Sequence, residues 1–261
     1  MPTSLYTTTG LLEAPLVGTD GSVLFSNVTG GGVYRYHEQG TETVLAARRG
    51  IGGLVWHANG GVVMTGRDMS YIGTDSVTRQ ILTLDGATGF NDLTVGADGA
   101  LYAGVLRHQP QRGEPAGPSE VIKIGPAGDV SIAAENIRWP NGLGFTPDGQ
   151  ALYVSEYAES RILLIDNGES HVFATAPSGE CDGLAVDAEG GVWVALGTGS
   201  AVARFTPDGR LDTKIDLPDG FVSSVAFDGS TLLITTAGRL LSHPVGITGT
   251  PIPATLIPLP D

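Results

Sequence analysis

A hairpin signal that recurs along the whole chain is the feature that most constrains its fold. Strand-like runs are interrupted by turns built on Asp-Gly or a close relative, at Asp20-Gly21, Asn59-Gly60, Asp98-Gly99, Asp148-Gly149, Glu189-Gly190 and Asp228-Gly229. These pairs favour tight hairpins because Gly, and to a lesser degree Asn and Asp, tolerate the positive φ of a type I′ turn. The turns recur about every 40 residues, with one interval of about 50. We therefore expect a repeated hairpin unit with six copies.

A second pair of strand-like runs lies between successive hairpins. Examples are residues 33–36 with 43–46, 121–124 with 130–133, and 162–165 with 171–174. A period near 40 residues with about four strands per repeat is typical of a propeller blade. No segment longer than about ten residues has helical periodicity. The sequence predicts an all-β, six-bladed β-propeller with four antiparallel strands per blade, formed as a single domain by residues 1–261.

Charge and cysteine content exclude several classes of function. The formal net charge is -14, which repels phosphate backbones and anionic membrane surfaces, so neither nucleic acid nor a membrane is an expected partner. The one cysteine, Cys181, excludes an intramolecular disulfide and a cysteine-based zinc cluster. The chain does not begin with a basic segment followed by an apolar run, so we expect a cytoplasmic protein. The sequence leaves the oligomeric state open.

One position of the repeat carries side chains with oxygen atoms. The residue seven positions before the turn residue is Glu13, Asn91, Asn141 or Asp182 in four repeats, and Gly52 or Phe221 in the other two. Equivalent residues at the start of the innermost strands lie at one height around a propeller axis, so four oxygens should converge in the channel. Two carboxylates and two carboxamides suit a hard divalent cation. We predict a metal site, with Ca²⁺ as the first choice and Zn²⁺, Mg²⁺ or Mn²⁺ as alternatives.

The alternative is that these side chains only satisfy backbone groups at the ends of strands, as Asn and Asp often do. The four residues occupy the same position of the repeat, and this favours the interpretation as a metal site. Two carboxylates buried near one another without a cation would be destabilising, or one of them would have to bind a proton.

Four segments carry a resemblance to a known family. They are Leu12-Glu13-Ala14-Pro15, Phe90-Asn91-Asp92, the stretch from Trp139-Pro140-Asn141-Gly142 to Asp148-Gly149, and Cys181-Asp182-Gly183-Leu184. The chain resembles the SMP-30/gluconolactonase/luciferin-regenerating-enzyme family of calcium-dependent lactonase propellers over nearly its whole length. The resemblance implies that Glu13, Asn141 and Asp182 hold the metal. It makes Asn91 a further ligand, or a contact to substrate and water.

The chain departs from the family pattern at three positions. Ala14 stands where the family usually has Gly, and Cys181 stands where Pro is common. Gly89 stands where sugar-acid lactonases of the family tend to carry Arg. Without that cation, a less polar or uncharged lactone or ester fits as well as a sugar-acid lactone.

The predicted metal site, together with this resemblance, implies a metal-dependent hydrolase that opens a lactone or related ester. The metal would polarise the substrate carbonyl, and Asp182 would act as general base or nucleophile. Asn91, Arg107, His108 and Trp139 are the expected substrate contacts. Arg107 and His108 begin a proline-containing stretch, residues 107–119, which is either a lid or a surface insertion.

Two other functions stay open. One is a non-enzymatic propeller with structural calcium and a top face that binds a ligand or a protein. The other is a phosphotriesterase-like or specialised-pathway enzyme on the same scaffold. Cys181 has no histidine at a recognisable partner position, and we expect it to be a buried small hydrophobe rather than a nucleophile.

Overall fold

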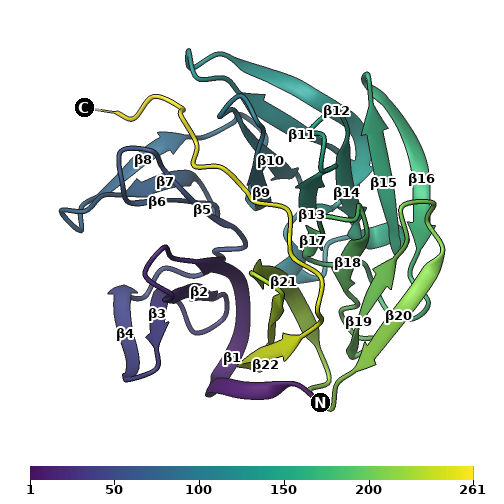
Figure 1. The fold of residues 1–261 in the computed structure, drawn as a ribbon. Helices are drawn as coiled ribbons and strands as arrows, with labels where there is room; N and C mark the ends of the chain where they lie inside the picture. The colour runs from purple at the N-terminus through teal and green to yellow at the C-terminus, as the bar shows by residue number, and fades with distance from the viewer. Residues whose placement is uncertain (261) are drawn as a thin grey trace.

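The computed structural model describes residues 1–260, which form strands arranged around a central axis (Figure 1). The strands belong to five hydrogen-bonded sheets, and in four of these the four strands follow chain order. The first of these sheets consists of β5 (Leu54–Trp56), β6 (Val62–Met64), β7 (Met69–Ile72) and β8 (Thr78–Leu82), and the second of β9 (Gly89–Val95), β10 (Leu101–Leu106), β11 (Pro118–Ile124) and β12 (Val130–Arg138). The third consists of β13 (Pro140–Phe145), β14 (Leu152–Glu156), β15 (Arg161–Asp166) and β16 (Glu169–Thr175). The fourth consists of β17 (Leu184–Val186), β18 (Val192–Ala195), β19 (Ala201–Phe205) and β20 (Leu211–Asp216).

The fifth sheet has six strands and joins the two ends of the chain. Its order is β21 (Val222–Asp228), β22 (Thr231–Pro244), β1 (Thr3–Val17), β2 (Val23–Asn27), β3 (Val33–His37) and β4 (Gly40–Leu45). Two short 3₁₀ turns, η1 (Pro110–Arg112) and η2 (Tyr157–Glu159), lie between strands. Within residues 1–260 no helix has the length and apolarity needed to cross a membrane.

The all-β propeller is confirmed, but the prediction of six separate four-stranded blades is wrong. The strands form five sheets because β1 pairs with β22 from Thr3 to Leu11 and then with β2 from Leu12 to Val17. The first and last repeats therefore share one long strand and one sheet. This pairing closes the ring and leaves the N-terminal strand without a free edge.

The hairpin turns occur where they were expected, but the type I′ geometry is wrong. Gly21 has a φ of 78°, whereas Asp20 is not among the residues with positive φ. Gly21 N donates to Gly18 O at 3.1 Å, and Asp20 Oδ1 accepts from Ser22 N at 3.0 Å. The aspartate stabilises the turn through its side chain, and only the glycine adopts the left-handed conformation.

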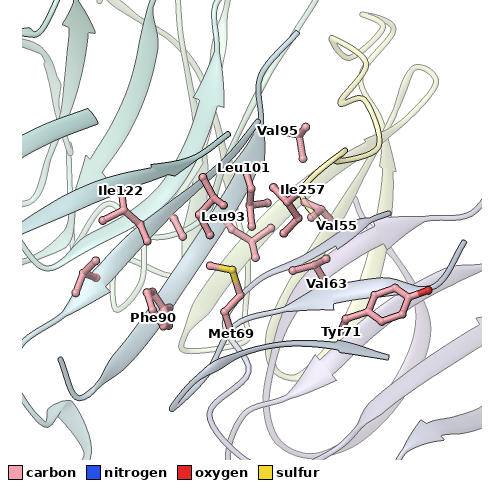
Figure 2. Close-up of a cluster of buried hydrophobic side chains, with 13 residues drawn as sticks. Val55, Val63, Met69, Tyr71, Phe90, Leu93, Val95, Leu101, Ile122 and Ile257 are labelled. Carbon is pink, nitrogen blue, oxygen red and sulfur yellow. The ribbon is translucent and has the colours of Figure 1, made fainter. Parts of the chain in front are cut away.

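The core lies between neighbouring sheets. One cluster joins the β5–β8 sheet to the β9–β12 sheet, and Phe90, Met69 and Leu101 are its largest fully buried side chains (Figure 2). Burying each such side chain contributes about 1.5–3 kcal/mol. Ile257 of the C-terminal segment packs into the same cluster, so a residue far along the chain helps to fix two early sheets.

The C-terminal segment crosses the central channel at the end where the hairpin turns lie (Figure 1). Ala188 N donates to Thr248 O at 2.8 Å, and Thr255 N donates to Trp56 O at 2.8 Å. Leu256 N donates to Gly99 O at 2.9 Å. These bonds tie the segment to three sheets and close that end of the channel.

Candidate metal and active site

The six innermost strands, β1, β5, β9, β13, β17 and β21, contact one another in order around the axis. The residues predicted to hold a metal lie on four of these strands or directly before them. Glu13 is in β1, Asn91 in β9 and Asn141 in β13, and Asp182 precedes β17. All four therefore lie at the end of the channel opposite the hairpin turns.

Breaks in strand register occur at these positions. The pairing of β1 with β2 shifts between Glu13 and Leu16, and that of β13 with β14 shifts between Pro140 and Leu143. A third shift separates Phe90 from Leu93 in β9. Such bulges redirect side chains that would otherwise alternate between the two faces of a sheet.

Backbone strain accompanies two of the bulges. Ala14, which follows Glu13, has a φ of 52°, and Trp139, which precedes Pro140, has a φ of 62°. Non-glycine residues seldom adopt this conformation, and it persists only where the surrounding structure enforces it. Because glycine adopts a positive φ without strain, it would also suit position 14.

Contacts link the four predicted ligands. Asn91 Nδ2 donates to Pro140 O at 3.3 Å, and Gly142 N donates to Asp182 O at 3.3 Å. Burial raises the pKa of the Asp182 carboxyl, and the neighbouring Asn141 side chain offsets part of that rise. The charge of Asp182 raises the pKa of Glu13. The structure thus brings the four residues together at one end of the channel.

Three acids at this end have raised pKa values. Burial raises the pKa of Asp182 well above its ordinary value, and the charge of Asp92 adds to this effect. Burial also raises the pKa of Glu13, with contributions from Asp182 and then Asp92. For Asp92 itself, burial raises the pKa to about 7. A cation placed among these carboxyls would favour their ionised forms.

Asp92 is a site residue that the sequence reasoning missed. It follows Asn91, and its Oδ1 accepts from Leu93 N at 2.7 Å. Because the strand register shifts across Asn91 and Asp92, both of these adjacent residues belong to the channel end of β9. The available signal was an acid directly after Asn91 in the strand-like run Phe90 to Val95.

One feature of the predicted ligands supports a bound metal. Asp182 is buried, and its Oδ1 has no hydrogen-bond partner among the described residues. An ionised oxygen in that state is destabilising unless a proton or a cation compensates it. Within residues 1–260 no three His, Cys, Asp or Glu side chains gather at metal-site separations, so any metal here depends on the Asn carboxamides as ligands. The residues fit a hard cation such as Ca²⁺.

A cavity of about 380 Å³ lies in the channel next to this site. Its lining includes Ala14, Asp92, Leu143 and Leu184, which follow the predicted ligands along their strands. The C-terminal residues 248–253 line its other end. None of the four predicted ligands lines the cavity, so they lie above it, toward the opposite mouth of the channel.

The predicted substrate contacts divide into two groups. Arg107 is exposed and donates to both carboxylate oxygens of Glu120, so its charge is already paired. His108 is buried and lies 4.7 Å from Trp139 between ring centroids. The stretch 107–119 contains η1 and the start of β11, and is therefore partly ordered by local structure.

Comparison with known proteins gives the family. The model of the SMP-30/gluconolactonase/LRE-like region matches residues 11–238, and the chain belongs to this family. The family match agrees with the resemblance and with the all-β propeller.

Individual relatives agree with this assignment. The pentonolactonase XacC of Haloferax volcanii is 29% identical over 168 residues, which is 59% of this chain and 55% of the relative, so the match spans about half of that protein. A gluconolactonase of Xanthomonas campestris superposes with a TM-score of 0.82 at 27% identity, over 94% of this chain and 88% of the other. A calcium-binding regucalcin of Agrobacterium tumefaciens superposes at 0.83 with 21% identity, over 99% and 98%, and shows the shared fold.

Proposed function

We propose that this protein is a metal-dependent hydrolase that opens a lactone or a related ester, with Ca²⁺ as the first-choice metal. The observation that carries the proposal is the buried, unpartnered Oδ1 of Asp182 beside Glu13 and Asp92. Acids whose pKa values are raised by burial and by a nearby charge are typical of a functional site. The named lactonases among the relatives support the substrate class.

The metal ligands would be Glu13, Asn91, Asn141 and Asp182. When bound, Ca²⁺ would polarise the lactone carbonyl and stabilise the negative charge that develops on its oxygen. The four side chains supply a summed charge of about -2, which matches a divalent cation.

Asp182 is the proposed catalytic residue. Its unpartnered Oδ1 is free to accept a proton from the attacking water as a general base, or to attack the carbonyl as a nucleophile. Both roles require the ionised carboxylate. The neighbouring Asn141 side chain favours that form.

Hydrolysis of a lactone panel tests the proposal. Each lactone releases a carboxylic acid, so base uptake in a pH-stat reports turnover directly. We expect hydrolysis with added Ca²⁺, loss after dialysis against a chelator, and recovery when Ca²⁺ is restored. Full activity in chelator would refute the metal dependence. The absence of turnover with every lactone, aryl ester and phosphotriester would refute the enzymatic function and favour a binding propeller.

A further inference from the structure

The C-terminal strap, residues 248–257, crosses the end of the channel opposite the candidate metal site (Figure 1). It lies outside residues 11–238, which match the family, so it is an addition to the shared propeller. Its contacts divide it into three parts. We call residues 248–250 the anchor, residues 251–253 the span and residues 255–257 the latch.

The anchor is held by hydrogen bonds to the β17 sheet. Ala188 N donates to Thr248 O at 2.8 Å, and Thr250 N donates to Val186 O at 2.8 Å. Thr250 Oγ1 adds a bond to Asp187 O, a backbone carbonyl, at 3.1 Å. None of these bonds involves a group that titrates near neutral pH. The anchor therefore keeps its hydrogen bonds when the solution becomes mildly acidic.

The span covers the cavity of about 380 Å³ without being bonded to its walls. Pro251, Ile252 and Pro253 all line the cavity. Within residues 1–260 no backbone hydrogen bond reaches any of the three. The two prolines lack an N–H and have a fixed φ, so this short segment is stiff. A displacement of the latch is therefore carried to the cavity.

The latch is held by packing and by hydrogen bonds. Ile257 is buried in the cluster between the β5–β8 sheet and the β9–β12 sheet. Thr255 N donates to Trp56 O at 2.8 Å, and Thr255 Oγ1 donates to Gly99 O at 3.0 Å. Opening the latch would expose Ile257 to water and break these bonds, so the closed form dominates at neutral pH.

The ring of His57 contacts the latch and fixes its own protonation state. It is buried, its Nδ1 accepts from Asn59 N at 3.0 Å, and its Nε2 lies 2.9 Å from Ile257 O. Because a backbone N–H can only donate, Nδ1 carries no proton. The proton of the neutral ring is therefore on Nε2, which donates to Ile257 O.

A second proton has no favourable place on this ring while the latch is closed. It would have to sit on Nδ1, where it would face the N–H of Asn59 and break that hydrogen bond. The result would be a buried cation with two donors pointing at each other, which is strongly disfavoured. Release of the latch exposes the ring to water and removes both penalties.

The groups around the ring do not offset a positive charge. Tyr71 of β7 packs edge to face against it at 5.5 Å between centroids. Residues 248–260 contain no charged side chain. The turns packed against the ring and the latch contain Asp75 and Asp98, which already pair with Arg79 and Lys123.

We propose that the strap is an acid-released device, in which protonation of His57 opens the latch and the span moves off the cavity while the anchor holds. Solvent then gains a second route to the cavity, from the end opposite the candidate site. Because only the open form accepts the second proton, acid favours opening. The opening constant should rise by up to about tenfold for each pH unit below about 6.5, where an exposed imidazole gains its proton. The proposal does not depend on hydrolase activity.

Hydrogen exchange measured by NMR between pH 8 and pH 5 tests the proposal. After correction for intrinsic exchange rates, the latch amides of Thr255 and Leu256 should lose about tenfold or more of their protection between pH 6.5 and pH 5. The anchor amide of Thr250 should keep its protection over the same range. Latch protection that does not change with pH would overturn the proposal. An equal loss at Thr250 would also overturn it, because the acid effect would then be general destabilisation.

The substitution His57→Gln removes the titration from the latch. Its carboxamide can still donate to Ile257 O and accept from Asn59 N, so the latch should close with protection that is independent of pH. His171→Gln, at an exposed histidine on the outer strand β16, is the matched control and should respond to acid as the wild type does. A wild-type acid response in His57→Gln would show that His57 does not control the latch.

The ring nitrogens of the wild type give a readout that needs no variant. In protein labelled with ¹⁵N-histidine, His57 should show the neutral Nε2–H tautomer at pH 7.5. Its second protonation should coincide with the loss of protection at Thr255. A neutral Nδ1–H tautomer, or a doubly protonated ring with the latch amides still protected, would contradict the proposed device.

Discussion

Burial raises the pKa of Glu13 and the charge of Asp182 raises it further, although Glu13 lies in the first strand and Asp182 precedes β17. The fold brings these distant acids together by placing inner strands side by side around one axis. In the absence of a cation, this proximity disfavours the ionised form of both groups. The consequences for activity and for stability can be measured separately.

The substitution Asp182→Asn should abolish hydrolysis, with a loss of at least about 10³-fold in kcat even at saturating Ca²⁺. The carboxamide keeps the shape of the side chain but can neither accept the proton nor attack the carbonyl. Asp166→Asn, at an exposed acid that ends β15, is the matched control and should retain full activity. Turnover at wild-type rate in Asp182→Asn would remove this residue from the chemistry.

The metal-free protein should become less stable as the pH rises from about 4 to about 7. Asp92 has a pKa of about 7 in the folded state against 3.8 as its ordinary value, so the folded state binds more protons between these values. Stability therefore falls as the pH rises through this window. Urea unfolding in chelator measures the slope, and Asp92→Asn should flatten it. A slope that is the same in both proteins would contradict the burial of an uncompensated carboxyl.

Cys181 should prove chemically inert. Its side chain is buried, and burial raises the pKa of its thiol to about 12. Because the thiolate is the reactive form, a thiol reagent should modify the protein only after unfolding in urea. Cys181→Ala should keep full activity and lose about 1 kcal/mol of stability from its packing in the core. Rapid labelling of the native protein would contradict this placement.

The buried ion pair of Arg204 and Asp187 should be the most sensitive polar contact outside the site. Asp187 accepts from Arg204 Nε at 2.8 Å and from Trp193 Nε1 at 2.9 Å, and it has no exposed surface. Asp187→Ala removes the buried acceptor of Arg204 Nε and Trp193 Nε1, while Arg204 keeps its pair with Asp212, and should cost about 3–5 kcal/mol. Asp208→Ala removes the exposed pair with Arg210 and should cost less than about 1 kcal/mol. Chemical denaturation compares the two, and equal losses would contradict the argument.

The hairpin positions could be predicted because turn chemistry is local. Asp20-Gly21 and its counterparts fix where the chain reverses, and counting back from each turn located Glu13, Asn91, Asn141 and Asp182. A shared register works because equivalent inner strands occupy equivalent places around the axis.

The shared sheet could not be predicted because it depends on pairing between chain ends. Nothing local distinguishes the part of β1 that pairs with β22 from the part that pairs with β2. Asp92 was missed because counting back from each turn selects only one residue per repeat. The bulge in β9 instead brings two adjacent side chains, those of Asn91 and Asp92, to the site. The contact of Trp139 with Tyr157 was not predicted, because Tyr157 comes from a 3₁₀ turn that follows β14 and has no place in the repeat.

Calcium titration by calorimetry on chelator-treated protein tests the central claim most directly. We predict one Ca²⁺ per chain, with proton release seen as a binding heat that depends on the buffer, because Glu13, Asp92 and Asp182 have raised pKa values in the metal-free state. Glu13→Gln should weaken the affinity at least about tenfold. Absence of binding heat, or unchanged affinity in Glu13→Gln, would contradict the metal site.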